Sequence, residues 1–339
     1  MKKFLLPIVC LAIVGAVSSC FDPTIDQSGT SSASDRNAKQ GEDGPRQCAT
    51  MDVLAENIKE NPGLAKKLDD IDKQASRFMK SGSLAAAAAP YTGVVTIPVR
   101  VHVIYNTAQQ NISDAQIQSQ ITVLNRDYRK TNSDVSLLPG VFSNLASDMQ
   151  IQFTLASVDR KQSSKTSWGT RDAMKSSKKG GVDAIDPTRS LNIWVCNIGG
   201  GILGYAQFPG GTAATDGVVI GPQYFGSRDL VPSGGYFASP YDKGRTATHE
   251  VGHWLNLRHI WGDASCGNDQ VADTPTQQTA NYGCPAFPHV TCGNGPNGDL
   301  FMNYMDYTND ACMYMFTNGQ TARSRALFAS DGARRTFVQ

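Results

Sequence analysis

The chain has 339 residues, of which 40% are hydrophobic and 18% are charged, and its formal net charge is +1. This size and composition suit one globular domain of ordinary size with flanking segments. A balance of charge so close to neutral gives no reason to expect nucleic acid or a strongly acidic surface as a partner.

The N-terminus has the pattern of a secretory signal. Residues 1–3 are Met-Lys-Lys, and the apolar run that follows, at about 14 residues, is too short to span a membrane. The segment 17–20, Val-Ser-Ser-Cys, resembles a bacterial lipobox, in which Cys20 becomes the lipidated first residue; ordinary cleavage near Ser19 is the alternative. We therefore expect residues 1–19 to be a signal peptide. We expect the protein to contact a membrane only through an N-terminal lipid anchor.

The next part is expected to contain a tether and two helices. Residues 20–46 are rich in Ser, Asp, Gly and Gln and have few large apolar side chains, which predicts a disordered tether. Apolar residues at roughly helical spacing predict helices at 51–61 and 64–79, separated by Asn61-Pro62-Gly63. The stretch 81–90, with its run of alanines, is expected to be an exposed boundary open to cleavage.

Strands and helices alternate after this boundary. Residues 95–105 alternate between apolar and more polar side chains, which predicts a strand with one buried face. The capping box at 113–116 opens a helix that runs to Tyr128. Further strands are expected at 150–158, 191–198 and 218–220.

The segment from His249 to His259 contains three of the five histidines of the chain. Residues four apart share a face of a helix, so His249 and His253 can direct two imidazoles at one zinc ion. Glu250 then projects beside the metal, where it can take a proton from a metal-bound water. His259 can join them only if the helix stops and the chain turns back near Asn256, a residue type that tolerates the left-handed conformation. Three protein ligands leave zinc's fourth position open, as in catalytic sites.

With these residues the sequence resembles the metzincin metalloproteases, whose pattern is H-E-x-x-H-x-x-G-x-x-H followed by a Met-turn. Asn303-Tyr304-Met305-Asp306-Tyr307 matches the Met-turn, and with the residues that follow it is most similar to the pappalysin branch, which includes ulilysin-like bacterial proteases. Asn256 stands where the family has glycine. The resemblance implies an α+β metzincin fold. Residues 91–259 would form a mixed twisted sheet with a backing helix and an active-site helix, and residues 260–339 an irregular, disulfide-stabilised C-terminal subdomain.

The resemblance also implies roles for residues of the cleft. Met305 would form the apolar floor below the three histidines, and Tyr307 would stabilise the oxyanion formed during cleavage, although it could instead only pack in the core. Residues 199–201 and 204–208 would lie at the rim, where an edge strand could pair with a peptide. Several pappalysin relatives cut before arginine by means of an acidic residue just ahead of the last cysteine, and Asp310 lies near that place.

The cysteines suggest latency and cross-links. The thiolate of Cys48 could occupy the fourth position on zinc, which resembles the cysteine switch of pappalysin-type proenzymes and makes residues 47–90 a propeptide. A disulfide or an idle thiol is the alternative. Four further cysteines should pair in an oxidising compartment, with three connectivities open. The resemblance favours Cys266–Cys292 and Cys284–Cys312.

The loop that begins at Cys266 is rich in oxygen donors, which suits calcium. The resemblance implies a calcium site with ligands from Asp269, the carbonyl of Ala272, and Thr274. A turn held by Asp side chains is the alternative.

Taken together, the residues and the resemblance predict a secreted or cell-envelope, lipid-anchored zinc endopeptidase. It would be made as a latent zymogen and would act on protein or peptide substrates as a monomer. One alternative is a surface lipoprotein that binds peptides or glycans, with zinc in a purely structural role. Against this, a structural zinc has no use for Glu250. A zinc hydrolase that acts on a non-peptide bond is a further alternative.

Overall fold

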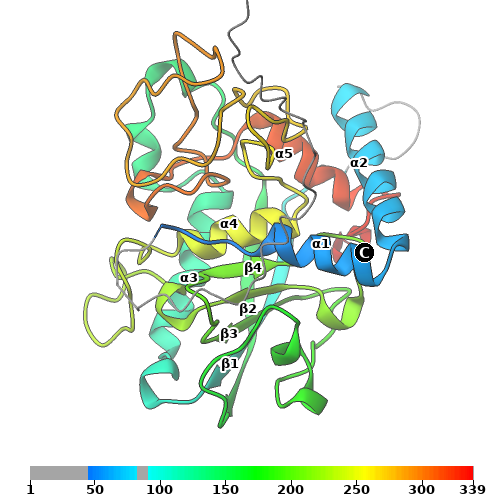
Figure 1. Cartoon of the computed structure of the whole chain (residues 1–339), viewed down its shortest axis with the longest axis vertical. Coiled ribbons are helices and arrows are strands. Elements are labelled where there is room, and N and C mark those ends of the chain that lie inside the picture. The colour runs from blue at the N-terminus through cyan, green and yellow to red at the C-terminus, as the bar shows by residue number, and fades with distance from the viewer. Residues whose placement is uncertain (1–44, 82–90, 339) are drawn as a thin grey trace, which may run out of the picture. The chain divides into compact units, whose positions relative to one another are not determined.

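A five-stranded sheet forms the centre of the computed structural model, which describes residues 45–81 and 91–338 (Figure 1). The order of its strands is β2-β1-β3-β5-β4, and only β4 runs antiparallel to its neighbour. β4 therefore lies at one edge. The strands are β1 (Val95–Tyr105), β2 (Ile151–Gln162), β3 (Leu191–Cys196), β4 (Gly204–Ala206) and β5 (Val218–Ile220).

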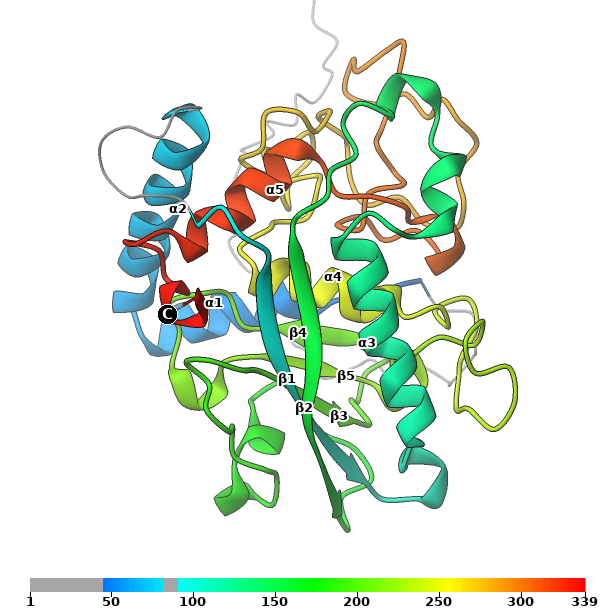
Figure 2. The ribbon, with the colours of Figure 1, turned by 180° about the vertical axis from the view of Figure 1, so that it is seen from behind.

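Two helices cover one face of this sheet (Figure 2). The helix α3 (Asp114–Tyr128) is capped by Ser113, whose side chain accepts a hydrogen bond from the N–H of Gln116. The second half of the expected capping box is not formed, because the Gln116 side chain donates to the carbonyls of Pro222 and Phe225. The helix α4 (Arg245–Trp254) lies beside α3, and the hydroxyl of Tyr128 donates to the carbonyl of Thr248 at 3.0 Å. The alternate residues of β1 that face these helices, from Val95 to Val103, are fully buried with them in one core. This burial explains the period of two in the sequence.

The opposite face of the sheet has its own, smaller core. Trp194 and Cys196 of β3 lie there with Val219 of β5, and Trp168 and Met174 from the preceding loop cover them. Because β3 is buried on both faces, it is a continuous apolar run with few polar interruptions.

The N-terminal helices pack against the rest of the chain. α1 (Thr50–Glu60) and α2 (Gly63–Ser81) begin and end within two residues of the expected limits. The expected limit of the tether is wrong at its last residue, because Arg46 is buried and hydrogen-bonded. Residues 1–44, which include Cys20 and the rest of the expected signal peptide and tether apart from Pro45, lie outside the described residues. No helix in the described ranges is long and apolar enough to cross a membrane.

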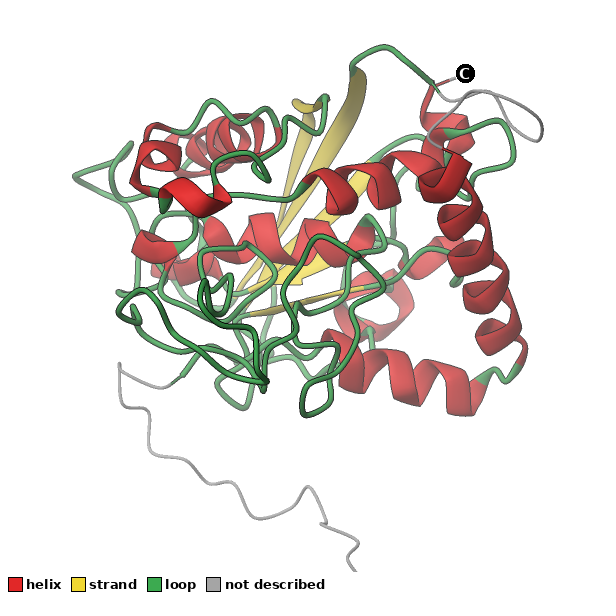
Figure 3. Ribbon diagram, turned by 90° about the horizontal axis from the view of Figure 1, so that it is seen from above, coloured by secondary structure: helices red, strands yellow, loops and turns green. Residues whose placement is uncertain are grey.

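The C-terminal part is mostly irregular. Residues 255–317, all of them described, contain no α-helix or β-strand, and their loops are drawn in green in Figure 3. Two disulfides, Cys266–Cys292 and Cys284–Cys312, cross-link this region in the pairing that the resemblance implies. The helix α5 (Asn318–Arg325) was not anticipated from the sequence, although Thr317 and Gln320 form a capping box at its start.

Candidate active site

The active-site helix ends where the sequence predicts a reversal. The N–H of Asn256 bonds to the carbonyl of His253 at 2.9 Å, and the N–H of Leu257 bonds to the carbonyl of Gly252 at 2.9 Å. Asn256 has a φ of 70°, so it occupies the left-handed position of a Schellman motif. The chain turns back at this residue, and the turn brings His259 to the same side as the helix histidines.

The three histidines converge on one point. Their Nε2 atoms are separated by 3.1 Å between His253 and His249 and by 3.1 Å between His253 and His259. All three side chains are buried. Each ring uses its other nitrogen, Nδ1, to hold its orientation. The partners of Nδ1 are the Tyr304 carbonyl for His249 (2.7 Å), the Leu257 carbonyl for His253 (2.8 Å) and the Asp263 carboxylate for His259 (2.5 Å).

These contacts test whether the site fits a metal. A ring that donates from Nδ1 to an oxygen has its lone pair on Nε2, so lone pairs meet at the centre of the cluster. Burial, followed by the neighbouring histidines, lowers the pKa of His249 and His253 well below the usual value, which keeps the rings neutral. The ligand atoms of the three histidines and Cys48 all lie within 4.8 Å of one another. Three imidazoles and one thiol form a donor set that fits zinc.

Glu250 lies beside this cluster and is held by the N-terminal segment. Its carboxylate is 1% exposed, and burial raises its pKa to about 7. The hydroxyl of Thr50 donates to Oε2 at 2.9 Å, and Sγ of Cys48 lies 3.4 Å from the same oxygen. The sequence identified Cys48 but missed Thr50, which is only two residues further along the chain.

The N-terminal segment pairs with the edge of the sheet. The N–H of Ala49 donates to the carbonyl of Gly204 at 3.1 Å, and the N–H of Leu203 donates to the carbonyl of Gln47 at 2.9 Å. Residues 47–49 therefore run parallel to β4 at the rim where the sequence predicts strand pairing with a peptide. Gly204 also lets β4 pack closely on β5 and α4, because an added Cβ would meet the Val219 carbonyl oxygen at 2.9 Å and Cγ of Glu250 at 3.0 Å.

Arg46 enters a pocket at one end of this segment. Its guanidinium forms an ion pair with Asp310, and both side chains are almost fully buried. It also donates to the carbonyl of Thr308 and to the hydroxyl of Thr246, each at 3.3 Å, and it lies 4.8 Å from the ring centre of Tyr241. Sequence reasoning gave Arg46 no role, because no local pattern links it to a carboxylate 264 positions away.

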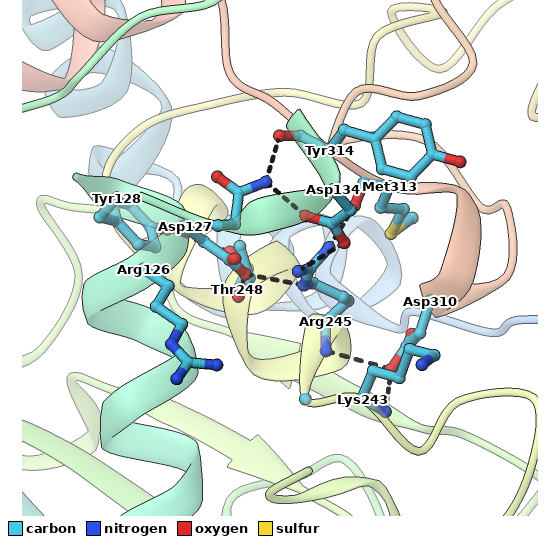
Figure 4. A network of polar contacts seen from close by, with 12 residues as sticks. Arg126, Asp127, Tyr128, Asp134, Lys243, Arg245, Thr248, Asp310, Met313 and Tyr314 are labelled. Carbon is cyan, nitrogen blue, oxygen red and sulfur yellow. Dashed lines mark hydrogen bonds and ion pairs between the residues drawn. The ribbon is translucent and has the colours of Figure 1, made fainter. Parts of the chain in front are cut away.

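The start of α4 holds Asp310 in place (Figure 4). The backbone N–H groups of Lys243 and Arg245 donate to Oδ2 of Asp310 at 2.9 and 3.1 Å. The side chain of Arg245 bridges Asp127 and Asp134, at 3.0 Å from each carboxylate. Because Oδ2 is committed to the helix terminus, Oδ1 of Asp310 faces the guanidinium in the pocket.

Met305 and Tyr307 approach the histidines from the Met-turn. Met305 is fully buried, and a Cβ added to Gly252 of α4 would lie 2.4 Å from its sulfur. The hydroxyl of Tyr307 is 3.1 Å from Nε2 of His259, and burial raises its pKa well above the usual value. Tyr307 therefore keeps its proton and can donate a hydrogen bond at the centre of the site.

The loop expected to bind calcium is closed by its own hydrogen bonds. Asp269 is buried, and both oxygens of its carboxylate lie 2.9 Å from the hydroxyl of Thr274. The N–H of Val271 donates to the same carboxylate at 3.0 Å. These contacts form the Asp-held turn that is the alternative to calcium. Ligation of calcium by Asp269, Ala272 and Thr274 stays a prediction.

Comparisons with known proteins agree with this geometry. Residues 177–329 match the family described as pregnancy-associated plasma protein-A, peptidase M43. An extracellular metalloprotease of Pyricularia oryzae is 34% identical over 270 residues, which cover 76% of this chain and 84% of that protein. The structure of Tannerella forsythia mature mirolysin in complex with a cleaved peptide is 49% identical, has a TM-score of 0.70, and covers 73% of this chain and 96% of its own. A mutant of Tannerella forsythia promirolysin is 45% identical, has a TM-score of 0.76, and covers 86% and 97%.

The fold, the histidine cluster and these relatives together define a metalloprotease. The predicted α+β metzincin fold is confirmed. The chain belongs to the peptidase M43 family, described as pregnancy-associated plasma protein-A.

Proposed function

We propose that this metalloprotease is a secreted zinc endopeptidase made as a latent precursor. The observation that carries the proposal is the meeting of His249, His253 and His259 beside Glu250, with Cys48 closing the cluster. Relatives named extracellular metalloproteases support secretion. The precursor form is supported by the similarity to promirolysin, which covers more of this chain than mature mirolysin does.

The chemistry uses two side chains beside the metal ligands. When bound, zinc would act as a Lewis acid toward the scissile carbonyl and an attacking water. Glu250, once its carboxylate is free of Thr50 and Cys48, takes the proton of the water and delivers it to the leaving amine. The hydroxyl of Tyr307 donates a hydrogen bond to the carbonyl oxygen as negative charge develops on it.

Residues 47–90 act as the prosegment that imposes latency. Cys48 takes the position of the attacking water, and residues 47–49 take the edge of β4 that a peptide substrate would need. Activation then requires cleavage near residues 81–90, where the sequence has its alanine run. A Cys48→Ala precursor should show casein cleavage without activation, and complete latency of this variant would count against the switch.

We also propose a preference for arginine on the carboxyl side of the scissile bond. Arg46 supplies the support, because Asp310 already holds a buried guanidinium in the pocket. The pocket lies two residues from Cys48 along the prosegment, so it adjoins the reacting centre. An extended peptide at the centre would therefore place one of its own side chains on Asp310.

The main test replaces the general base. Glu250→Ala and Glu250→Gln chains should each bind one equivalent of zinc but lose nearly all cleavage of casein, a fall of about 10³-fold or more. Asp114→Asn is the control, because Asp114 lies outside the prosegment and its side chain is exposed. Undiminished cleavage by the Glu250 variants would refute the mechanism. A native chain that binds zinc but cuts nothing in any form would instead favour the non-catalytic binding lipoprotein.

Three smaller proposals accompany this function. Lipidation at Cys20 would anchor the precursor to a membrane, and metabolic labelling with a fatty acid tests it. Calcium ligation in the loop around Asp269 is tested by thermal unfolding with and without added calcium. The protease is expected to be a monomer, which gel filtration coupled to light scattering measures.

A further inference from the structure

The docking of α2 depends on one carboxylate. Oδ2 of Asp72 lies 2.8 Å from Nη2 of Arg258, and Oδ1 accepts hydrogen bonds from Nη2 of Arg323 and, at 3.3 Å, from the side-chain amide of Asn256. The side chain of Arg323 is 0% exposed, and that of Asp72 is 15% exposed. Figures 1 and 2 both show α2 beside α5, the helix that carries Arg323. The contact is therefore a partly buried site with three donors around one acidic group.

The two arginines need this carboxylate. In the part of the chain that the structure describes, Asp72 is the only acidic side chain in ion-pair contact with Arg258 or Arg323. Asp269 is the next acidic group that influences Arg323, but its carboxylate already accepts from Thr274. Nε of Arg258 is buried and has no hydrogen-bond partner. Loss of Asp72 would leave two like charges side by side, one of them deep in the protein.

Arg323 is also fixed in position by the mature part of the chain. Its Nε donates to the carbonyl of Asn256 at 2.7 Å, and its Nη1 lies 3.4 Å from the side-chain oxygen of Gln270. These contacts do not involve the prosegment, so they keep the guanidinium in place when α2 leaves. A pre-oriented guanidinium loses less entropy on binding a carboxylate than a mobile one does.

We propose that Arg258, Arg323 and the amide of Asn256 form a carboxylate-binding exosite of the activated protease. Its ligands are acidic side chains of peptides, and Asp72 is its internal ligand in the precursor. The proposal rests on the proposed function, because it needs a prosegment that leaves. The planar forks of two arginines match the two oxygens of a carboxylate, which is the group seen between them.

The exosite is linked to the metal cluster by one residue. Asn256 donates to the ligand from its side chain and accepts from Arg323 through its carbonyl. The same residue adopts the left-handed conformation that turns the chain toward His259. A bound acidic peptide therefore contacts the turn that positions a zinc ligand, while it leaves the cleft beside β4 free.

The first test uses the whole chain and a small carboxylate. In a Glu250→Ala chain, which cannot process itself, Asp72→Ala should lower the melting temperature. Sodium acetate at about ten times its dissociation constant should then raise the Tm by roughly 3–5 °C more than sodium chloride of equal concentration. Asp70→Ala is the matched control, because Asp70 lies on the same helix and forms an exposed ion pair with Lys66. Equal responses of the two variants to acetate would overturn the proposal.

The second test measures binding in trans. The Glu250→Ala chain is nicked by elastase in the alanine run and freed of its prosegment by gel filtration at high salt. A labelled peptide of residues 63–81 should then bind, the Asp70→Asn peptide should bind equally, and the Asp72→Asn peptide should bind roughly tenfold more weakly or worse. A receptor chain that carries Arg258→Gln should bind the native peptide only as tightly as the receptor with Arg258 binds the Asp72→Asn peptide.

Two results of this second test contradict the exosite: no binding of the native peptide, or equal binding of the Asp70→Asn and Asp72→Asn peptides. Neither assay depends on the proteolytic activity of this protein. If the wild-type chain cleaves casein but both assays fail, the exosite alone is refuted. If both assays succeed but the wild-type chain cleaves nothing, the proposed function alone is refuted.

Discussion

Replacing Thr50 by valine removes one hydroxyl that has two buried partners. It donates to Oε2 of Glu250 at 2.9 Å and accepts from the N–H of Ala206 at 2.8 Å. Valine has nearly the same shape, so the substitution removes the hydrogen bonds and keeps the packing. Thr50 is fully buried, which means that water cannot replace either partner while the prosegment is docked.

The expected effect follows from these two losses. A hydrogen bond to a charged group contributes about 1.5–3 kcal/mol, and an unsatisfied buried N–H costs about 1–3 kcal/mol. Together they weaken the docked state by roughly 2.5–6 kcal/mol, which corresponds to an open fraction larger by about 10²-fold to 10⁴-fold. Cys48 lies in the docked segment and is not disulfide-bonded. The rate of its alkylation in the metal-free precursor, followed by mass spectrometry, should therefore rise by a similar factor.

The Thr50→Ser precursor is the control, because serine keeps the hydroxyl. It should react with the alkylating reagent nearly as slowly as the native precursor. Cys196, the other free cysteine in the described ranges, is buried and serves as an internal reference for global unfolding. If the valine and serine precursors react at the same rate, Thr50 does not hold the prosegment and the argument fails.

The remaining predictions concern the mature part of the chain. Asp310→Asn should lower kcat/KM for peptides with arginine after the scissile bond by about 10²-fold, because it leaves a buried guanidinium unpaired. The kcat/KM for a peptide with glutamine at that position should change little. Gly252→Ala should lower stability by about 1–3 kcal/mol in thermal unfolding, since the new Cβ would press on Met305, whereas alanine in an open helix would raise it. Asp263→Asn should weaken zinc binding by about 10–100-fold in a competition titration, because Asp263 orients His259. Treatment with a chelator should abolish cleavage, and added zinc should restore it. An unchanged kcat/KM for the arginine peptide, an unchanged stability or an unchanged zinc affinity contradicts the role given to Asp310, Gly252 or Asp263, respectively. Cleavage that survives the chelator contradicts the metal mechanism.

Local patterns in the sequence were sufficient to predict the chain reversal at the metal cluster. The spacing of His249 and His253 placed them on one helical face, and Asn256 marked the turn that could bring His259 back. Both statements depend on residues within a few positions of one another. The period of two in β1 is of the same kind, because it records burial of one face of a single strand.

Contacts over long distances in the chain were not accessible in this way. Arg46 meets Asp310, and Asp72 meets Arg323, across more than 250 positions. In the sequence Arg46, Asp72 and Arg323 are ordinary charges in polar stretches, and composition led to Arg46 being assigned to the tether. Asp310 was noted only through the family resemblance. Only packing of the prosegment on the folded chain identifies them as buried partners.

The parallel pairing of residues 47–49 with β4 has a consequence for how the chain survives its own synthesis. An uncovered outer strand offers unpaired N–H and C=O groups to any neighbouring polypeptide, and this is a common route to aggregation. Here the edge of β4 is paired with residues 47–49, which are synthesised before it. A chain that is still folding therefore has no unpaired edge at β4. The edge of β4 is first exposed to solvent in a finished, disulfide-linked protein, so pairing of another polypeptide with this strand becomes possible only after activation.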